Sequence, residues 1–347
     1  MTAAQPSGTA GPGLETDRAA GPETGTSAGP VIGLDLGGTK IDAALVAVDG
    51  TVLRRHTRPT PARAGAAAVL DALAAAAREV DGGAGAIGVA AAGVIDPVTG
   101  TVTSATDSLT GWAGTALAAG LSARTGLPVA CDNDVRATAA TELAALDGSR
   151  RSLLLAAVGT GVGGAVAVDG RMLHGSAGIA GHLGHVPSPE AEGLRCTCGG
   201  SGHLEAVAAG PAITALYGRL AGEPVGRLQD VAGRAARGDA AARRAITTGA
   251  RAAGRVLGGL ANALGPDRVV VGGGVPRIGA LYWTALTEAF RAELMAPLRA
   301  LRPVPPRLGA DAAVRGAALL TRTTPLHGPA TPATGPAVPQ PVPGGTR

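Results

Sequence analysis

The sequence predicts an internally duplicated α/β fold, with two lobes around a cleft. Two stretches, 31–48 and 152–168, each indicate a strand, a glycine turn and a second strand, and each runs into Val-Asp-Gly. Predicted strands alternate with predicted helices elsewhere, which is typical of α/β proteins with partly parallel sheets. We therefore expect a first lobe over 30–132 and a second lobe over 133–322.

The elements outside the two hairpins follow from hydrophobic patterning and capping residues. In the first lobe we expect a helix over 62–80, a strand over 86–91, a helix over 113–125 and a strand over 127–131. A helix begins near Asn133 or Asp134, either of which is a good N-cap. After the second hairpin we expect helices over 211–222 and 239–264, a strand over 268–271, a helix over 276–296 and a closing helix over 312–321.

Composition excludes several classes of protein. The chain has 347 residues, of which 46% are hydrophobic, so it can bury a sizeable core and is not mostly disordered. Aromatic residues are only 1%, too few for a surface that stacks bases. The net charge is +4, but the arginines are spread along alanine-rich segments rather than clustered. We therefore expect no nucleic-acid partner.

The two ends of the chain differ from its body. Segments 1–29 and 323–347 are rich in proline, glycine, alanine and threonine, so we expect both to be disordered tails. The first contains only Met1 and Leu14 as large apolar residues, which excludes a signal-peptide core. No apolar run approaches the roughly 18 residues of a membrane span. These observations favour a cytoplasmic protein without membrane contact.

Glycine-rich turns are the first candidates for a binding site. Residues 159–164 match G-x-G-x-x-G, but a strand follows instead of a helix, and no acid lies in 179–184. This context argues against a dinucleotide-binding fold, and residues 37–40 do not match a P-loop.

Two facing hairpin turns with free backbone N–H groups can cradle a polyphosphate, although each alone could be only a tight turn. Asp35 lies just before the first turn and could hold Mg²⁺ through water. Three glycines after the strand at 268–271 permit close approach of an adenine or ribose. The predicted nucleotide-binding residues are Asp35, Gly37, Gly38, Thr39, Lys40, Thr160, Gly161, Gly163, Gly272, Gly273 and Gly274. Whether Lys40 contacts phosphate stays open.

These motifs resemble those of a known family. Asp35-Leu-Gly-Gly-Thr-Lys40, the 159–164 turn and the 272–274 turn are similar to phosphate and adenosine motifs of the actin-like (ribonuclease H-like) ATPase fold. Within that fold they most resemble the ROK family of repressors, open reading frames and sugar kinases, over about 31–322. The resemblance implies an ATP- and Mg²⁺-dependent kinase for a hexose or N-acylhexosamine, glucose or N-acetylmannosamine above all, acting at the 6-hydroxyl. It also implies a homodimer. Polyphosphate instead of ATP as donor stays open.

Asp132-Asn133-Asp134 stands at a predicted strand end and helix start, beside the cleft. Phosphoryl transfer to a hydroxyl needs a carboxylate near the attacking oxygen. The resemblance assigns a sugar-hydroxyl contact to Asn133 and the role of catalytic base to Asp134. The alternative is that Asp134 only caps a helix.

A second segment points to the sugar pocket. Residues 181–185 resemble the family's Gly-Glu-x-Gly-His, with His182 where glutamate is usual. A neutral imidazole accepts one hydrogen bond and donates one, and a donor suits an acetamido carbonyl better than a carboxylate does. Gly-His-x-Gly-His also occurs in some N-acetylmannosamine kinases of this family, so that sugar and glucose both remain candidates. His185 and Glu205 match further sugar-pocket positions, and Thr106, Asp107 and Trp112 have a weaker similarity to cleft-lining residues.

His185, Cys196, Cys198 and His203 follow the order H-x10-C-x-C-x4-H. Two thiolates and two imidazoles predict a tetrahedral Zn²⁺ site. The segment 185–205 resembles the ROK zinc loop, with His203 where a third cysteine is usual. Four protein ligands imply a structural metal that anchors His185 and Glu205. Cys131, on an apolar strand, is expected in the core, while His56, His174 and His327 show no partner in the sequence pattern.

Two other functions compete with a kinase. One is a sugar-responsive DNA-binding regulator, since ROK repressors share this body but carry an additional helix-turn-helix, for which 1–29 leaves no room. The other is a non-catalytic sugar-binding protein, which the presence of Asp35, Asn133 and Asp134 argues against.

Overall fold

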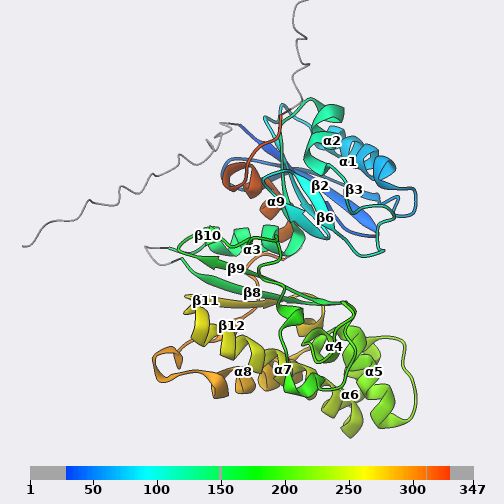
Figure 1. Cartoon of the computed structure of the whole chain (residues 1–347), viewed down its shortest axis with the longest axis vertical. Coiled ribbons are helices and arrows are strands. Elements are labelled where there is room, and N and C mark those ends of the chain that lie inside the picture. Colours follow the sequence, from blue (N-terminus) through cyan, green and yellow to red (C-terminus); the bar gives the residue numbers. More distant parts are fainter. Residues whose placement is uncertain (1–28, 148–150, 310, 329–347) are drawn as a thin grey trace, which may run out of the picture.

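The computed structural model describes residues 29–147, 151–309 and 311–328. Each lobe contains a five-stranded sheet, with strand orders β3-β2-β1-β4-β7 and β10-β9-β8-β11-β12 (Figure 1). In both sheets an antiparallel hairpin is followed by strands parallel to its first strand. The predicted duplicated α/β fold with two lobes is therefore confirmed.

The first sheet is sandwiched between helices. Its strands are β1 (Val31–Leu36), β2 (Lys40–Val46), β3 (Val52–Pro59), β4 (Ile87–Ala91) and β7 (Val129–Asn133), and its helices are α1 (Ala66–Val80), α2 (Leu117–Thr125) and α9 (Ala312–Thr323). Side chains alternate between the two faces of a strand. Accordingly, Ile32 and Leu34 pack in the cluster that contains α1, whereas Val31 packs with Val314 of α9.

Some helices of the first lobe begin later than the sequence predicts. The helix expected over 62–80 begins at Ala66, because Gly65 has a φ of 86° and stands at its N-cap. The helix expected over 113–125 begins at Leu117. The first lobe also contains three strands that were not predicted: the edge strand β3, and β5 (Val94–Asp96) and β6 (Thr101–Ser104), which form a small hairpin.

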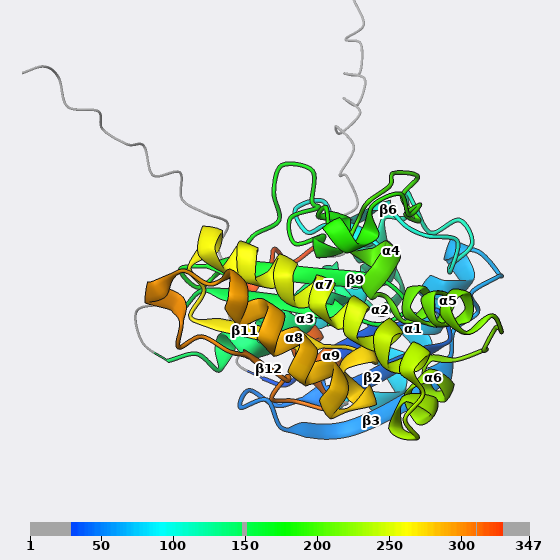
Figure 2. The same ribbon diagram turned by 90° about the horizontal axis from the view of Figure 1, so that it is seen from below.

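The second sheet also has a helix layer on each face. Its strands are β8 (Leu153–Val158), β9 (Val162–Val168), β10 (Arg171–Met172), β11 (Arg268–Gly272) and β12 (Pro303–Val304). One face is covered by α4 (Glu205–Ala208), α5 (Gly210–Ala221), α6 (Leu228–Ala236), α7 (Ala240–Leu264) and α8 (Ala280–Glu293). The long helices α7 and α8 lie along each other (Figure 2). The helix expected over 276–296 is shorter, since Gly279 has a φ of 113° and separates it from a 3-10 turn at 275–278.

Two helices meet between the lobes. The helix α3 (Asp134–Ala144) covers the other face of the second sheet, and α9 packs against β1, β4 and α3. A second lobe expected over 133–322 would include α9, whereas its packing places it on the first sheet. The chain therefore crosses between the lobes a second time before α9, and the α3–α9 contact joins the lobes.

The ends of the chain depart in part from the sequence-based expectation. The expectation of a tail from residue 323 is wrong for its first residues, because Thr323 ends α9 and His327 forms an antiparallel bridge with Val129. The rest of that tail and residues 1–28 lie outside the described residues. Among the described helices, none is long and apolar enough to cross a membrane.

The close packing of α9 predicts a measurable effect of one methyl group. A Cβ at Gly88 would lie 1.8 Å from the carbonyl oxygen of Ala317, which belongs to the α9 backbone. We expect Gly88→Ala to lower the stability by about 1–3 kcal/mol or more, since the backbones must separate. The control is Gly259→Ala in α7, where a Cβ meets nothing within 4 Å and should stabilise the helix. Equal melting temperatures of the two variants would contradict this packing.

Candidate active site

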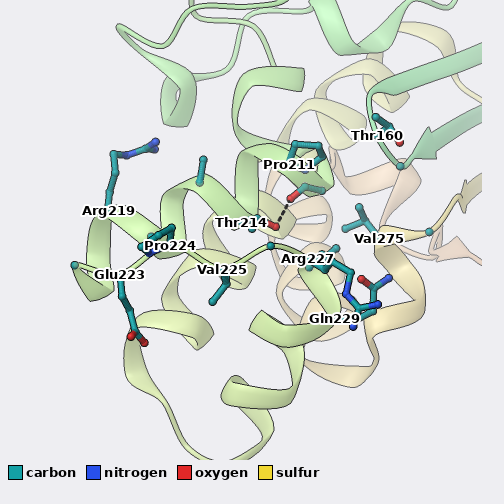
Figure 3. A pocket seen from close by; sticks show the side chains of 18 residues that line it. Thr160, Pro211, Thr214, Arg219, Glu223, Pro224, Val225, Arg227, Gln229 and Val275 are labelled. Carbon is teal, nitrogen blue, oxygen red and sulfur yellow. Dashed lines mark hydrogen bonds between the residues drawn. The ribbon is translucent and has the colours of Figure 1, made fainter. Parts of the chain in front are cut away.

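A cavity of about 1140 Å³ lies beside the glycine turns of the second lobe. Figure 3 shows its lining, in which Thr160 of the β8–β9 turn faces side chains of α5 and the segment before α6. Gly274 also lines it, so two of the predicted nucleotide-binding residues meet here. Most of the wall, including Pro211, Thr214 and Arg227, was missed, because residues 210–229 carry no motif.

The other predicted glycines do not line this cavity, and three of them have close contacts within the protein. A Cβ at Gly161 would lie 2.6 Å from the Glu205 carboxylate, and one at Gly273 would lie 2.2 Å from the Val158 carbonyl oxygen. In the first lobe, Gly37 donates its N–H to the Lys40 carbonyl and closes the β1–β2 turn. These contacts give the glycines a structural reason that is independent of any ligand.

Lys40 has a partner within the protein. Its ammonium group lies 2.5 Å from the Asp42 carboxylate, which also accepts a hydrogen bond from Thr57. Asp42 stands directly opposite Asp35 in the β1–β2 ladder. The Lys40 side chain is nevertheless 60% exposed, and a contact with phosphate stays a prediction.

Two half-buried carboxylates, Asp35 and Asp134, interact electrostatically. Burial, followed by repulsion from Asp134 and Asp42, raises the pKa of Asp35 from 3.8 to about 6. Burial also raises the pKa of Asp134. Because Asp35 is on β1 and Asp134 opens α3, the fold brings one predicted metal-holding carboxylate and the predicted base into one electrostatic field.

Asn133 is the N-cap of α3. Its Oδ1 accepts hydrogen bonds from the N–H groups of Val135 and Arg136, and its Nδ2 donates to the Gly93 carbonyl and to Asp134 Oδ1. Asp134 is the first helical residue and accepts from Val135 N–H at 2.9 Å. Capping is therefore chiefly the work of Asn133, and the Asp134 carboxylate is held in place by two donors.

A second cavity, of about 1280 Å³, lies between the lobes. The predicted sugar-binding residues Asn133, His182, His185 and Glu205 all line it. The first lobe contributes 103–107, so Thr106 and Asp107 line it as expected from their similarity. Trp112 does not: it is buried and donates its indole N–H to the Ala92 carbonyl.

The hydrogen bonds of His182 determine what it can offer a ligand. Nδ1 lies 2.8 Å from the Ile179 carbonyl oxygen, so this nitrogen carries the proton. Burial lowers the pKa of His182 and favours the neutral ring. Nε2 is then an acceptor, not the donor expected for an acetamido carbonyl. An acetamido group would be recognised through its N–H, and a sugar hydroxyl through its O–H.

Glu205 borders both the cavity between the lobes and a smaller one beside the β8–β9 turn. Its carboxylate accepts hydrogen bonds from Val162 N–H at 2.9 Å and from the Thr197 hydroxyl at 2.5 Å. It lines the larger cavity between the lobes and, with Thr160, a smaller one of about 380 Å³. The same side chain therefore borders both the candidate sugar pocket and the β8–β9 turn.

The four predicted metal ligands come together. One nitrogen or sulfur atom of each of His185, Cys196, Cys198 and His203 lies within 4.8 Å of the others. The Cys196 Sγ–His185 Nδ1 distance is 3.6 Å and the Cys198 Sγ–His203 Nδ1 distance is 3.3 Å. Tetrahedral Zn²⁺ with usual bond lengths would separate sulfur and nitrogen ligands by about 3.5 Å. The donor set and its spacing fit zinc. The His185 ring also stacks on His182, with centroids 6.3 Å apart.

Comparisons with known proteins agree with this architecture. The N-acetylmannosamine kinase of Escherichia coli O1:K1 / APEC is 34% identical over 293 residues, which cover 84% of this chain and 98% of that protein. The ROK hexokinase structure from Thermus thermophilus has 35% identity and a TM-score of 0.74, covering 84% of this chain and 97% of that one. A ROK family glucokinase from Streptomyces griseus, in complex with glucose and AMPPNP, has 30% identity and a TM-score of 0.68, covering 84% and 99%.

A regulator is also among the similar structures. A ROK family transcriptional regulator, a homolog of the E. coli MLC protein, has 26% identity and a TM-score of 0.73, with 85% of this chain matching 78% of that one. The ROK family model matches residues 31–324. The chain thus belongs to the ROK family and has the actin-like ATPase fold of the family's sugar kinases.

Proposed function

We propose that this protein is an ATP-dependent kinase that phosphorylates a hexose or an N-acylhexosamine at the 6-hydroxyl. One observation carries the proposal: Asn133, His182, His185 and Glu205, from distant parts of the chain, line a single cavity between the lobes. Glu205 also borders the β8–β9 turn, where the phosphates of a nucleotide would lie. In this proposal, a sugar bound in the cavity presents its hydroxyl to a phosphoryl group held at the turn.

Asp134 acts in this proposal as the base that accepts the proton of the attacking hydroxyl. Its carboxylate is oriented by Val135 N–H and Asn133 Nδ2. Its raised pKa makes the carboxylate a stronger base than an exposed aspartate. Asn133 contacts a sugar hydroxyl, and closing of the lobes excludes water that would otherwise hydrolyse ATP.

The nucleotide lies against both glycine turns in this proposal. The turns at 37–40 and 159–164 cradle the phosphates, and the cavity bordered by Thr160 and Gly274 takes the base and ribose. Asp35 is the residue that would hold Mg²⁺ through water, and its repulsion from Asp134 suits a divalent cation there. When bound, Mg²⁺ supplies neutralisation of the charge on the transferring phosphoryl group.

The sugar is the finer part of the proposal. The acceptor nitrogen of His182 can bind a 2-hydroxyl or the N–H of a 2-acetamido group, so glucose and N-acetylmannosamine both fit its chemistry. The test is coupled ATP turnover with glucose, N-acetylmannosamine, N-acetylglucosamine and fructose, repeated with polyphosphate as donor. We expect sugar-dependent turnover with at least one of the first two. No turnover on any sugar would overturn the proposal.

We propose that Zn²⁺ bound by His185, Cys196, Cys198 and His203 is structural. All four tetrahedral positions are filled by protein, so the metal would fix His185, on which His182 stacks. We expect metal analysis to give about one zinc per chain, and well under half of that for Cys198→Ala. The matched control is Cys131→Ala, which removes a cysteine that is buried in the core of the first lobe. This variant should keep about one zinc per chain. Unchanged zinc in Cys198→Ala would contradict the site.

We also propose that the enzyme works in the cytoplasm as a homodimer, as the family resemblance implies. Sedimentation should then give twice the chain mass of 33.5 kDa. A species of single-chain mass at micromolar concentration would contradict the dimer.

A further inference from the structure

A buried charged network lies directly behind the proposed base. Asp132, the residue before Asn133, is 2% exposed in its side chain, and Arg136 on the first turn of α3 is 1% exposed. Arg136 Nη1 donates to Asp132 Oδ1 at 2.8 Å. On the other oxygen, His174 Nε2 lies 2.7 Å from Asp132 Oδ2. Each carboxylate oxygen of Asp132 is thus engaged by a different element of the fold.

The partners of Asp132 also hold the loop that carries His182. His174 stands at the start of this loop, and its carbonyl accepts the N–H of Ala180 at 3.0 Å. The second guanidinium nitrogen of Arg136 donates to the carbonyl of Gly178, in the middle of the loop. His182 is tied back to the loop by its own bond to Ile179. One buried guanidinium therefore bridges the β7–α3 junction and the 174–182 loop.

The loop also meets the first lobe. A Cβ at Gly178 would lie 3.3 Å from the Val94 side chain of β5, and Asn133 Nδ2 donates to the carbonyl of the neighbouring Gly93. The junction of β7 and α3, the 174–182 loop and the β5 strand thus come together around Asp132. His182 belongs to this loop, and both His182 and Asn133 line the cavity between the lobes. A displacement of the loop would therefore move His182 relative to Asn133 within that cavity.

We infer that Asp132, Arg136 and His174 are positioning residues that set the distance between the His182 loop and the Asn133–Asp134 junction. They act through these neighbours and do not contact the reacting atoms. A planar guanidinium with two fixed donors suits this task, since it makes two bonds in one geometry. The inference rests on the proposed function. It adds the residues that hold His182 at a fixed distance from Asn133 in the candidate sugar pocket.

The network predicts a selective kinetic effect. His174 is the best site for a variant, since its side chain is 30% exposed and the Asp132–Arg136 pair stays intact without it. We expect His174→Ala to raise the KM for the sugar roughly tenfold, the effect of losing one hydrogen bond to a charged group, with the KM for ATP unchanged. His174→Gln, whose amide can still donate to Asp132, should recover most of the loss. The matched control is His56→Ala on β3, which should change neither constant.

Arg136→Lys provides a second variant. Lysine keeps the charge beside Asp132 but cannot bond Asp132 and Gly178 together as a fork does. We expect the same rise in sugar KM. A sugar KM within twofold of the wild type in His174→Ala would overturn the inference. Equal rises in both KM values, without recovery in His174→Gln, would also overturn it, because a general loss of structure would explain them.

Hydrogen exchange separates this inference from the kinase proposal. In the protein without ligands, His174→Ala should speed amide exchange at 174–182 and leave α7 unchanged, whether or not any sugar is phosphorylated. Unchanged exchange at 174–182 would overturn the positioning role. If the wild type phosphorylated no sugar but His174→Ala still sped amide exchange at 174–182, only the proposed function would be overturned.

Discussion

Asp134→Asn should lower kcat by about 100- to 10,000-fold, the usual contribution of a positioned general base. The asparagine oxygen can still accept the N–H of Val135, so the first turn of α3 is kept. Because burial raises the pKa of Asp134, removing its charge does not cost stability. The melting temperature should therefore equal or exceed that of the wild type, while sugar-dependent ATP turnover falls.

The matched control for this variant is Asp71→Asn. Asp71 lies on α1, is 69% exposed and pairs with Arg124 at the surface. The Asp71→Asn variant loses the same charge far from the cleft, and exposed ion pairs contribute little to stability. Turnover should stay within twofold of the wild type. If Asp134→Asn retained a comparable rate, Asp134 would be only a helix residue and the assigned base would be wrong.

Asp35→Asn should abolish sugar phosphorylation and at the same time stabilise the protein. The folded protein raises the pKa of Asp35 from 3.8 to about 6, chiefly by burial. Above pH 6 the folded state therefore carries a carboxylate that it holds less favourably than the unfolded chain does. By linkage this amounts to on the order of 3 kcal/mol, which the uncharged asparagine removes.

The stability difference between Asp35→Asn and the wild type should depend on pH. As the pH falls from 6 to 4, the folded wild type takes up a proton that the unfolded chain does not, so its stability deficit against Asp35→Asn disappears. We expect denaturant unfolding to show a stabilised variant at pH 7 and nearly equal proteins at pH 4. Activity of the wild type, which needs the charged carboxylate, should fall as the pH drops through about 6. A variant that is no more stable than the wild type at pH 7 would contradict the buried charge.

Local patterns predicted the parts of the fold that depend on neighbouring residues. The two hairpins were found because glycine turns interrupt apolar runs at 31–48 and 152–168. The edge strand β3 was missed because its exposed outer position tolerates a polar, arginine-rich sequence. The return of α9 to the first sheet was missed because it depends on close contacts between glycines such as Gly33 and Gly88 and a distant helix backbone. Such long-range contacts leave no periodic signal.

At the site, too, residues in local motifs were predicted and long-range contacts were missed. Asn133, His182, His185 and Glu205 were found through motifs, and they line one cavity. The tautomer of His182 depends on the carbonyl of Ile179, a backbone group that a sequence cannot position. His174 had no visible partner, because its contact with Asp132 spans 42 residues.

The central claim is transfer of phosphate from nucleotide to sugar, and labelled ATP tests it most directly. Wild-type protein should be incubated with ATP labelled in the γ-phosphoryl group, Mg²⁺ and either glucose or N-acetylmannosamine, and the products separated. We expect the label on the 6-position of at least one of these sugars, with little inorganic phosphate. Label that appears only as inorganic phosphate, or stays on ATP with both sugars, would contradict the claim.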